Sequence, residues 1–349
     1  MHAPKSGKRL TIIDIAQMAG VSKKTVSRVI NQAPYVNERT RARIEAIIAE
    51  HGYEPDPQAR GLAFRRSFLV GLIHDNPNSQ YMENLQLGIL DALVGRGYEL
   101  VIRPCDRRSP SFLDDMRTFV GRLRLAGVVL APSVSEDESL IKLLSAAECP
   151  YVRVACAPLD KPAHLVLSHD ARGAAAAARR LAQLGHRRIA YISGPPLFRS
   201  SHERRAGFTE GLAEYGLELA PELTVPGAYT YESGLARGRD LLLRTDRPTA
   251  IFAGNDEMAS GVYSAAHELG IRIPEELSII GFDDAPIASR IWPAMTSVRL
   301  PVRDMGRMAA EKLFVAPQDS SEAPSAEFTP TLIERQSTAP PAVIKPSRS

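Results

Sequence analysis

The segment Thr11–Asn31, TIIDIAQMAGVSKKTVSRVIN, has the pattern of two short helices joined by a tight turn. Apolar side chains recur at helical spacing on both sides of Gly20, which stands where the chain must turn sharply. Thr11 and Ser22 are expected to cap the two helices, because a hydroxyl oxygen can accept a hydrogen bond from an unpaired backbone N–H. The spacing therefore predicts a helix-turn-helix, although any short helix pair with a glycine turn can imitate one.

The head of the chain is also basic. Residues 1–66 contain twelve Lys and Arg against six Asp and Glu, while the whole chain has a net charge of only +3. A third helix is expected from Asn37 to about Gly52, and Glu54–Pro57 then forms a stiff joint. A basic head on a mildly acidic body indicates a polyanion partner for the head, with a solvated basic face as the alternative.

From Phe68 onward, short apolar runs alternate with amphipathic helical stretches. Such alternation predicts right-handed crossovers onto parallel sheets, and the number of strands favours two similar α/β lobes over one sheet. The expected strands are Phe68–Ile73, Glu99–Arg103, Gly127–Ala131, Tyr151–Ala155, Leu165–Leu167, Arg188–Ile192, Ala250–Ala253 and Leu277–Gly281. The expected helices are Asn84–Gly95, Phe112–Leu125, Glu136–Ala147, Ala171–Leu184, Arg204–Gly216, Ser233–Leu243 and Glu257–Leu269.

Several of these stretches closely resemble the lactose-repressor (LacI/GalR) family. The match covers the following segments: Thr11–Ala16, Ala19–Ser22, Thr25–Asn31, Val36–Arg41, Gly52–Pro55, Phe252–Ala259 and Ile280–Asp284. The resemblance extends to about residue 338 and so covers nearly the whole chain. It implies an N-terminal all-α helix-turn-helix head with a hinge helix, followed by a two-lobed α/β core like that of periplasmic binding proteins.

The domain boundaries that follow are 1–57 for the DNA-binding helix-turn-helix domain and 58–66 for the hinge. Residues 67–338 form the effector-binding and dimerisation core. Its N-subdomain takes about 67–168 and 298–328, and its C-subdomain about 169–297 and 329–338. The tail 339–349 is expected to be disordered. No apolar heptads occur in it, so a homodimer is expected rather than a coiled-coil tetramer.

Cations and hydroxyl groups at the start and along the exposed face of the second helix suit base edges and phosphates in a major groove. The predicted DNA-binding residues there are Lys23, Lys24, Thr25, Ser27, Arg28 and Asn31. The resemblance places Lys23, Lys24 and Arg28 at base-reading positions, and Arg28 would pair well with a guanine. Many relatives do not have lysine at both of the first two positions, so Lys23 and Lys24 could instead add phosphate affinity rather than specificity. Thr25 and Ser27 suit phosphate contacts or packing, and Asn31 a backbone contact. The alternative is a set of ordinary surface cations.

The segment Gln58–Ala63 resembles the family's hinge. The resemblance implies that Leu62 wedges into the minor groove and that Arg60 contacts phosphate. Leu62 could instead pack on the core domain.

Polar residues follow several predicted strands, at the sheet edge where α/β lobes bind ligands. These are Asn76, Arg204, Asn255 and Asp283, a set suited to the hydroxyl groups of a sugar. The resemblance gives Arg204, Asn255 and Asp283 the main hydroxyl contacts, Tyr81 and Tyr229 the aromatic ones, and places Ser200 and His202 in the same loop. Burial in the core is the alternative for the tyrosines, and helix capping for Asp283. Asp256 is expected to cap the helix that begins at Glu257.

Purine-binding relatives use an arginine and two adjacent aromatic residues. Here Met82 stands beside Tyr81, and Phe198 falls where that arginine would lie, so a sugar is favoured over a purine, although Arg199 is nearby. The sequence has no phosphate-binding loop, no HExxH or GxSxG motif and no metal-ligand spacing. We therefore expect no enzymatic activity and no bound cofactor or metal.

Three cysteines without a CxxC pair, no apolar run of membrane length and no secretory signal predict a reduced, cytoplasmic protein near the nucleoid. The function predicted is a sequence-specific transcriptional repressor that a small sugar or sugar derivative releases from double-stranded, pseudo-palindromic operator DNA. The alternatives are a purine- or nucleoside-responsive repressor, a sugar-binding protein without a regulatory role, and a sugar-processing enzyme.

Overall fold

The computed structural model describes residues 10–30, 35–53, 67–314 and 326–342, and the chain divides into two compact units, 1–68 and 69–349. The first unit contains α1 (Ile12–Met18), α2 (Lys23–Ile30) and α3 (Glu38–His51). Their buried side chains form a small core that includes Ile15, Val26, Val29 and Ile44. A three-helix head with its own core is confirmed.

The capping residues expected in the head are also confirmed. Thr11 and Asp14 form a reciprocal capping box at the start of α1. The Ser22 hydroxyl accepts a hydrogen bond from the backbone N–H of Thr25 over 3.1 Å, and the Asn37 side chain accepts one from Arg39. Gly20 has φ +60°, so the turn between α1 and α2 uses a left-handed conformation that favours glycine.

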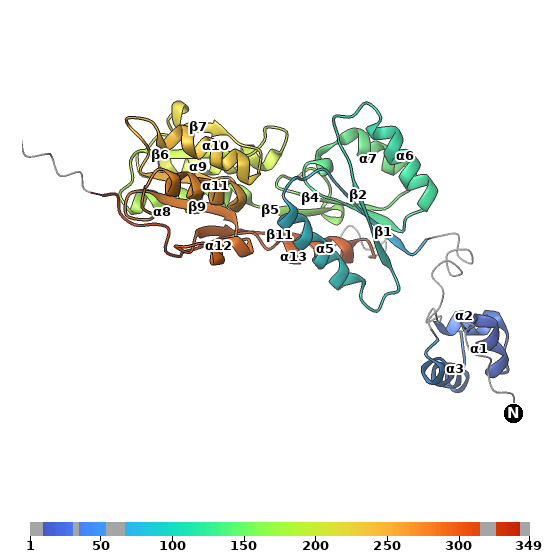
Figure 1. The fold of residues 1–349 in the computed structure, drawn as a ribbon. Coiled ribbons are helices and arrows are strands. Elements are labelled where there is room, and N and C mark those ends of the chain that lie inside the picture. The colour runs from blue at the N-terminus through green and yellow to red at the C-terminus, as the bar shows by residue number, and fades with distance from the viewer. Residues whose placement is uncertain (1–9, 31–34, 54–66, 315–325, 343–349) are drawn as a thin grey trace, which may run out of the picture. The chain divides into compact units, whose positions relative to one another are not determined.

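The second unit contains two lobes, each built around its own six-stranded sheet (Figure 1). The sheet of the first lobe is parallel throughout, in the order β11-β5-β4-β3-β1-β2. Its strands are β1 (Leu69–His74), β2 (Glu99–Pro104), β3 (Gly127–Leu130), β4 (Tyr151–Ala155), β5 (Leu165–Ser168) and β11 (Ala326–Phe328). The helices of this lobe are α5 (Ser79–Leu93), α6 (Phe112–Leu123), α7 (Glu138–Ala146) and α13 (Val302–Lys312).

The sheet of the second lobe has the order β12-β10-β9-β8-β6-β7, and only β12 runs antiparallel to its neighbour. Its strands are β6 (Ile189–Ser193), β7 (Thr224–Pro226), β8 (Ala250–Ala253), β9 (Ser278–Asp283), β10 (Thr296–Arg299) and β12 (Thr331–Ile333). Its helices are α8 (Asp170–Gln183), α9 (Arg199–Ala213), α10 (Tyr231–Leu242), α11 (Asp256–Glu268) and α12 (Pro286–Arg290). No helix in the described ranges combines the length and the apolar character that a membrane span needs.

The chain passes between the two lobes three times, after Ser168, after Arg299 and after Phe328. The subdomain boundary expected before residue 298 falls inside β10, which belongs whole to the second lobe. The expected start of the tail is also too early, because Ala339 exchanges hydrogen bonds with Ser278 and lies 2.9 Å from a ring nitrogen of His186.

In the described part of the chain, four strands and two α-helices were not predicted from the sequence. β7, β11 and β12 have three residues each, too few for an alternating pattern to show. β10, α12 and α13 were also missed, and α9 begins at Arg199 rather than at Arg204, so Arg204 lies in its second turn. The start of α9 was missed because no side chain caps it.

Helix pairs approach closely where one of them carries glycine. A Cβ on Gly88 in α5 would collide with the backbone carbonyl of Arg303 in α13. By contrast, a Cβ on Gly121 in α6 would meet no atom within 4 Å. Two glycines in helices of the same lobe therefore have opposite roles.

We expect Gly88→Ala to lower the free energy of unfolding by about 1–3 kcal/mol, because the backbones of α5 and α13 must separate to admit a methyl group. Gly121→Ala should instead raise it by about 0.5–1 kcal/mol through its better helix propensity. Thermal and urea unfolding of the two variants tests this pair. Equal unfolding midpoints would show that the α5–α13 contact does not require glycine.

Candidate functional site

The exposed face of α2 presents three cations. Lys23, Lys24 and Arg28 are exposed, while Thr25 and Ser27 are half-buried. The Thr25 hydroxyl lies 2.9 Å from that of Ser22, at the start of the helix. The structure thus brings five of the predicted DNA-binding side chains onto one short helix. Asn31, Arg60 and Leu62 lie outside the described residues.

A cleft between the two lobes of the body is lined by polar and aromatic side chains from both. Its walls leave about 420 Å³ unfilled, including the part open to solvent. The lining residues are Asn76, Asn78, Tyr81, Pro132, Cys156, Ser168, Asp170, Phe198, Ser200, Arg204, Tyr229, Asn255, Asp283 and Leu300. Seven of the eight predicted effector residues are therefore brought together. His202 is not, since its side chain is exposed and its Nε2 lies 2.9 Å from the carbonyl oxygen of Pro196.

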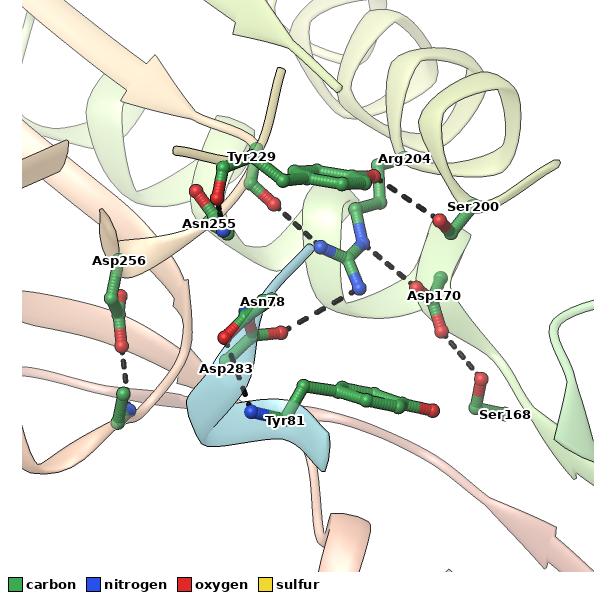
Figure 2. Close-up of polar contacts among 12 residues, drawn as sticks. Asn78, Tyr81, Ser168, Asp170, Ser200, Arg204, Tyr229, Asn255, Asp256 and Asp283 are labelled. Atoms are coloured by element: carbon green, nitrogen blue, oxygen red, sulfur yellow. Dashed lines mark hydrogen bonds and ion pairs between the residues drawn. The ribbon is translucent and has the colours of Figure 1, made fainter. Parts of the chain in front are cut away.

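Arg204 is the centre of this cleft, and Figure 2 shows its guanidinium between the carboxylates of Asp170 and Asp283. Its Nε donates to Asp170 over 2.8 Å, and its Nη1 donates to the carbonyl oxygen of Gly254. Its Nη2 lies 3.7 Å from Asp283 Oδ1. The guanidinium carbon is 3.6 Å from the centre of the Phe282 ring, so the ring covers one face of the cation.

The buried charge of Arg204 is balanced mainly by Asp170. Only 5% of Arg204 and 2% of Asp170 is exposed. Burial by itself lowers the pKa of Arg204, but Asp170, with smaller effects from Tyr229 and Asp283, raises the pKa above its usual value. The other oxygen of Asp170 accepts a 2.6 Å hydrogen bond from the Ser168 hydroxyl. Removing either partner would leave an uncompensated buried charge, which costs about 3–5 kcal/mol in comparable pairs.

Asp283 connects this cluster to the other lobe. Asn78, which caps α5 in the first lobe, donates a 2.8 Å hydrogen bond from Nδ2 to Asp283 Oδ2. The Oδ1 atom of Asp283 is buried and accepts no hydrogen bond from the described chain. Burial raises the pKa of Asp283 to about 7, against the opposing effect of Arg204. Asp283 and Asp284 have φ values of 106° and 53°, so strained backbone aims this carboxylate across the cleft.

Tyr229 forms part of the cleft wall above Arg204 (Figure 2). Its hydroxyl lies 3.1 Å from that of Ser200 and 3.0 Å from that of Ser201. Its φ is 61°, and Asn255 holds this strained residue by donating from Nδ2 to its carbonyl oxygen over 3.0 Å. Asn255 also caps α11 through its Oδ1, which accepts from the N–H of Met258. Both ends of this predicted ligand-binding amide therefore already have protein partners.

The expected role of Asp256 as a helix cap is wrong, because Asn255 takes that position. Asp256 is instead fully buried and accepts hydrogen bonds of 2.6 Å from the backbone N–H of Ala285 and from the hydroxyl of Ser297. It therefore fixes the turn that follows Asp283.

A second set of contacts bridges the lobes behind the cleft wall. Arg107 donates to the carbonyl of Ser133 in its own lobe and to that of Leu197 in the other, over 3.0 and 3.1 Å. The Glu136 carboxylate accepts from the N–H of Arg199 at 3.3 Å, and burial raises the pKa of Glu136 to about 7. Leu197 and Arg199 flank Phe198, which lines the cleft, so these bridges join the two lobes next to a cleft residue.

Asp170 and Asn78 are the main residues that the sequence reasoning missed. Asp170 lies two residues beyond the end of β5, so the strand-end rule that found Asn76 and Asp283 could have found it too. Asn78 is two residues beyond Asn76, whose Oδ1 accepts the N–H of Asn78 over 2.9 Å. Here the sequence identified the loop but not the residue that reaches across the cleft.

Both units of the chain match known protein families. Residues 11–56 match the family "bacterial regulatory proteins, lacI family", and residues 178–338 match a periplasmic binding protein-like domain. The chain is 30% identical over 328 residues to the ribose operon repressor of Escherichia coli K12, covering 94% of this chain and 99% of the relative. It is 35% identical over 314 residues to the transcriptional regulator CelR of Thermobifida fusca, covering 88% and 91%.

Solved structures give the same picture. A CelR–cellobiose complex aligns with a TM-score of 0.69 at 31% identity, covering 94% of this chain and all of that one. The lac repressor dimer bound to operator and an anti-inducer aligns with a TM-score of 0.77 at 26% identity, covering 95% and 100%. A helix-turn-helix head and a two-lobed binding core define a DNA-binding transcriptional regulator. The chain belongs to the LacI family of bacterial regulatory proteins.

The raised pKa of Asp283 predicts a pH dependence of stability. Between about pH 4 and about pH 7 the folded chain holds a proton that the unfolded chain releases, so the contribution of Asp283 to stability falls as pH rises. Asp283→Asn removes this titration. We expect the stability of the wild type relative to the variant to decline from about pH 4.5 to about pH 8 in urea unfolding. Parallel pH profiles for the two proteins would contradict the assignment.

Proposed function

We propose that this protein is a transcriptional repressor that a small sugar releases from its operator DNA. The observation that carries the proposal is the buried Arg204–Asp283–Asn78 chain of contacts, which places hydrogen-bonding groups of both lobes in one cleft. The relatives support the repressor role, since they include the ribose operon repressor. The proposal involves binding of the sugar and not its turnover.

In this proposal two heads of a homodimer occupy the half-sites of a pseudo-palindromic operator. Lys23, Lys24 and Arg28 read bases or phosphates, and Thr25 and Ser27 support them. Leu62 of the hinge wedges into the minor groove, and Arg60 contacts phosphate. A sugar in the cleft changes the angle between the lobes and so biases the dimer between DNA-competent and released states. A coupling free energy of about 1–3 kcal/mol would change operator affinity about 5–150-fold.

The contacts in the cleft favour a sugar over a purine. Asp283 Oδ1 and Arg204 Nη2 lie beside each other and can meet a hydroxyl group, and the cleft around them is lined by Asn76, Asn255, Tyr81, Tyr229 and Ser200. Phe198 lies edge-on to Tyr229, with ring centres 5.5 Å apart, where an arginine would be needed for a purine. Met82 is buried in the core of the body rather than lining the cleft.

Mobility shift with a duplex selected from a random library tests the proposal. We expect at least one simple sugar to lower the affinity of the full chain for the selected duplex, within the range of about 5–150-fold. Tighter binding with sugar would make the protein a corepressor system instead. If deletion of residues 1–64 left duplex binding intact, the assignment of DNA binding to the head would be wrong.

Substitutions of the cations of α2 should have two different effects on DNA binding, one on selectivity and one on salt dependence. Arg28→Ala should weaken binding to the selected duplex by about 1–3 kcal/mol and relax selectivity, because a base contact is lost. Lys23→Ala should weaken selected and random duplexes alike and lower the salt slope by about 0.9, because a phosphate contact is lost. Fluorescence anisotropy at several salt concentrations measures both effects.

Arg43→Ala is the matched control, since it removes an exposed arginine from α3 rather than from α2. It should leave selectivity unchanged. A loss of selectivity for Arg43→Ala as large as that for Arg28→Ala would contradict the assignment of base reading to α2.

A further inference from the structure

We infer that the effector is an uncharged polyol and that the cleft discriminates against sugar acids and sugar phosphates. This inference rests on the proposed function and adds a chemical class to it. Its basis is a count of the charged groups that line the cleft. Among the described residues, these are one cation, Arg204, and two carboxylates, Asp170 and Asp283.

The single cation is already committed to the protein. Arg204 uses two of its N–H groups on Asp170 and on the Gly254 carbonyl, and Phe282 covers one face of the guanidinium. The remaining nitrogen, Nη2, faces Asp283 at 3.7 Å. With both carboxylates ionised, the lining carries a net charge of −1, and protonation of Asp283 brings it only to zero. In neither state is a positive charge left over for an anionic ligand.

An anionic group on the effector has two ways to bind, and both are unfavourable. It can approach Arg204 alongside the two carboxylates, where it adds a third negative charge in a site of low dielectric constant. Alternatively, it can displace Asp170 from Arg204. Asp170 is 2% exposed and would then keep only the Ser168 hydroxyl as a partner, leaving a buried carboxylate without its counter-charge.

The groups around the cleft do not reverse this balance. Arg107, a basic side chain that bridges the lobes, donates to two carbonyl oxygens and lies 4.0 Å from Asp75. Glu136 lies on the same side and accepts from the N–H of Arg199. The pKa of Cys156, a wall residue, is raised by burial and further by Asp170, Glu136 and Glu203, while Arg204 opposes them. Carboxylates therefore outweigh cations in and around the cleft.

A neutral hydroxyl fits the same groups without cost. Asp283 Oδ1 is buried without a hydrogen bond from the described chain, and Arg204 Nη2 is adjacent to it. One hydroxyl can donate to the oxygen and accept from the nitrogen, so that both groups gain a partner. The effector needs no charge to satisfy the site.

Calorimetry on the full chain, at constant ionic strength and about pH 8, tests the inference with matched ligand sets. Each set holds a neutral sugar, its uronic acid and its terminal phosphate: glucose, glucuronate and glucose 6-phosphate, and the corresponding galactose set. Ribose is compared with ribose 5-phosphate. We expect the neutral member of one set to bind at least about tenfold more tightly than its charged counterparts. An acid or a phosphate that binds as tightly as its neutral parent would overturn the inference.

Asp170→Asn tests the cause, because it removes the carboxylate that occupies Arg204. The preference for the neutral member should fall at least about threefold in this variant. Asp115→Asn, the same chemical change on the exposed face of α6, should leave the preference unchanged. If Asp170→Asn does not fold, Asp283→Asn takes its place, with the same expected decrease. A preference that stays at the wild-type value in the folded variant would contradict the charge argument.

The two proposals fail in different ways. If a neutral sugar releases the operator but its acid binds equally well, only the charge inference fails. If no ligand in any set binds, the sugar effector itself is wrong, and the charge inference falls with it.

Discussion

A buried arginine between two carboxylates is the constraint on which the binding cleft depends. A guanidinium that is 5% exposed is stable only if counter-charges and hydrogen-bond acceptors meet it from several directions. Here they come from the start of α8 (Asp170), the end of β8 (Gly254) and the end of β9 (Asp283). Arg204 therefore fixes the relative positions of three elements of the second lobe, and it does so at the point where the chain arrives from the first lobe.

The same cluster connects the lobes. Asp283 is held by Arg204 on one side and by Asn78 on the other, so a ligand that binds between them must interact with groups of both lobes. Residues with left-handed backbone gather here, namely Tyr229, Asp283 and Asp284, at a cost of about 1–3 kcal/mol each. Asn255 stabilises the first of these turns through the carbonyl oxygen of Tyr229, and Asp256 stabilises the other through the N–H of Ala285.

Much of this could be predicted from the sequence, for identifiable reasons. The helices of the head could be predicted because Thr11, Ser22 and Asn37 are typical helix-capping residues. Gly20 is typical of a tight turn. The longer strands could be predicted from their apolar runs. The positions of Asn76, Asn255 and Asp283 after predicted strands indicated that they bind the effector. The three-residue strands β7, β11 and β12 give no periodic signal, since their position depends on sheet pairing. The contacts of Asp170, Asn78 and Arg107 could not be assigned because their partners lie 34, 205 and 90 residues away in the sequence, although the strand-end rule could have marked Asp170 itself.

The central claim is that one equilibrium connects the cleft with the DNA-binding head, and thermodynamic linkage gives it a direct test. The affinity of the full chain for its neutral sugar can be measured with and without a saturating amount of the selected duplex. The account predicts that the duplex weakens sugar binding by the same factor by which the sugar weakens duplex binding. A sugar affinity that is identical in the presence and absence of the duplex would contradict it.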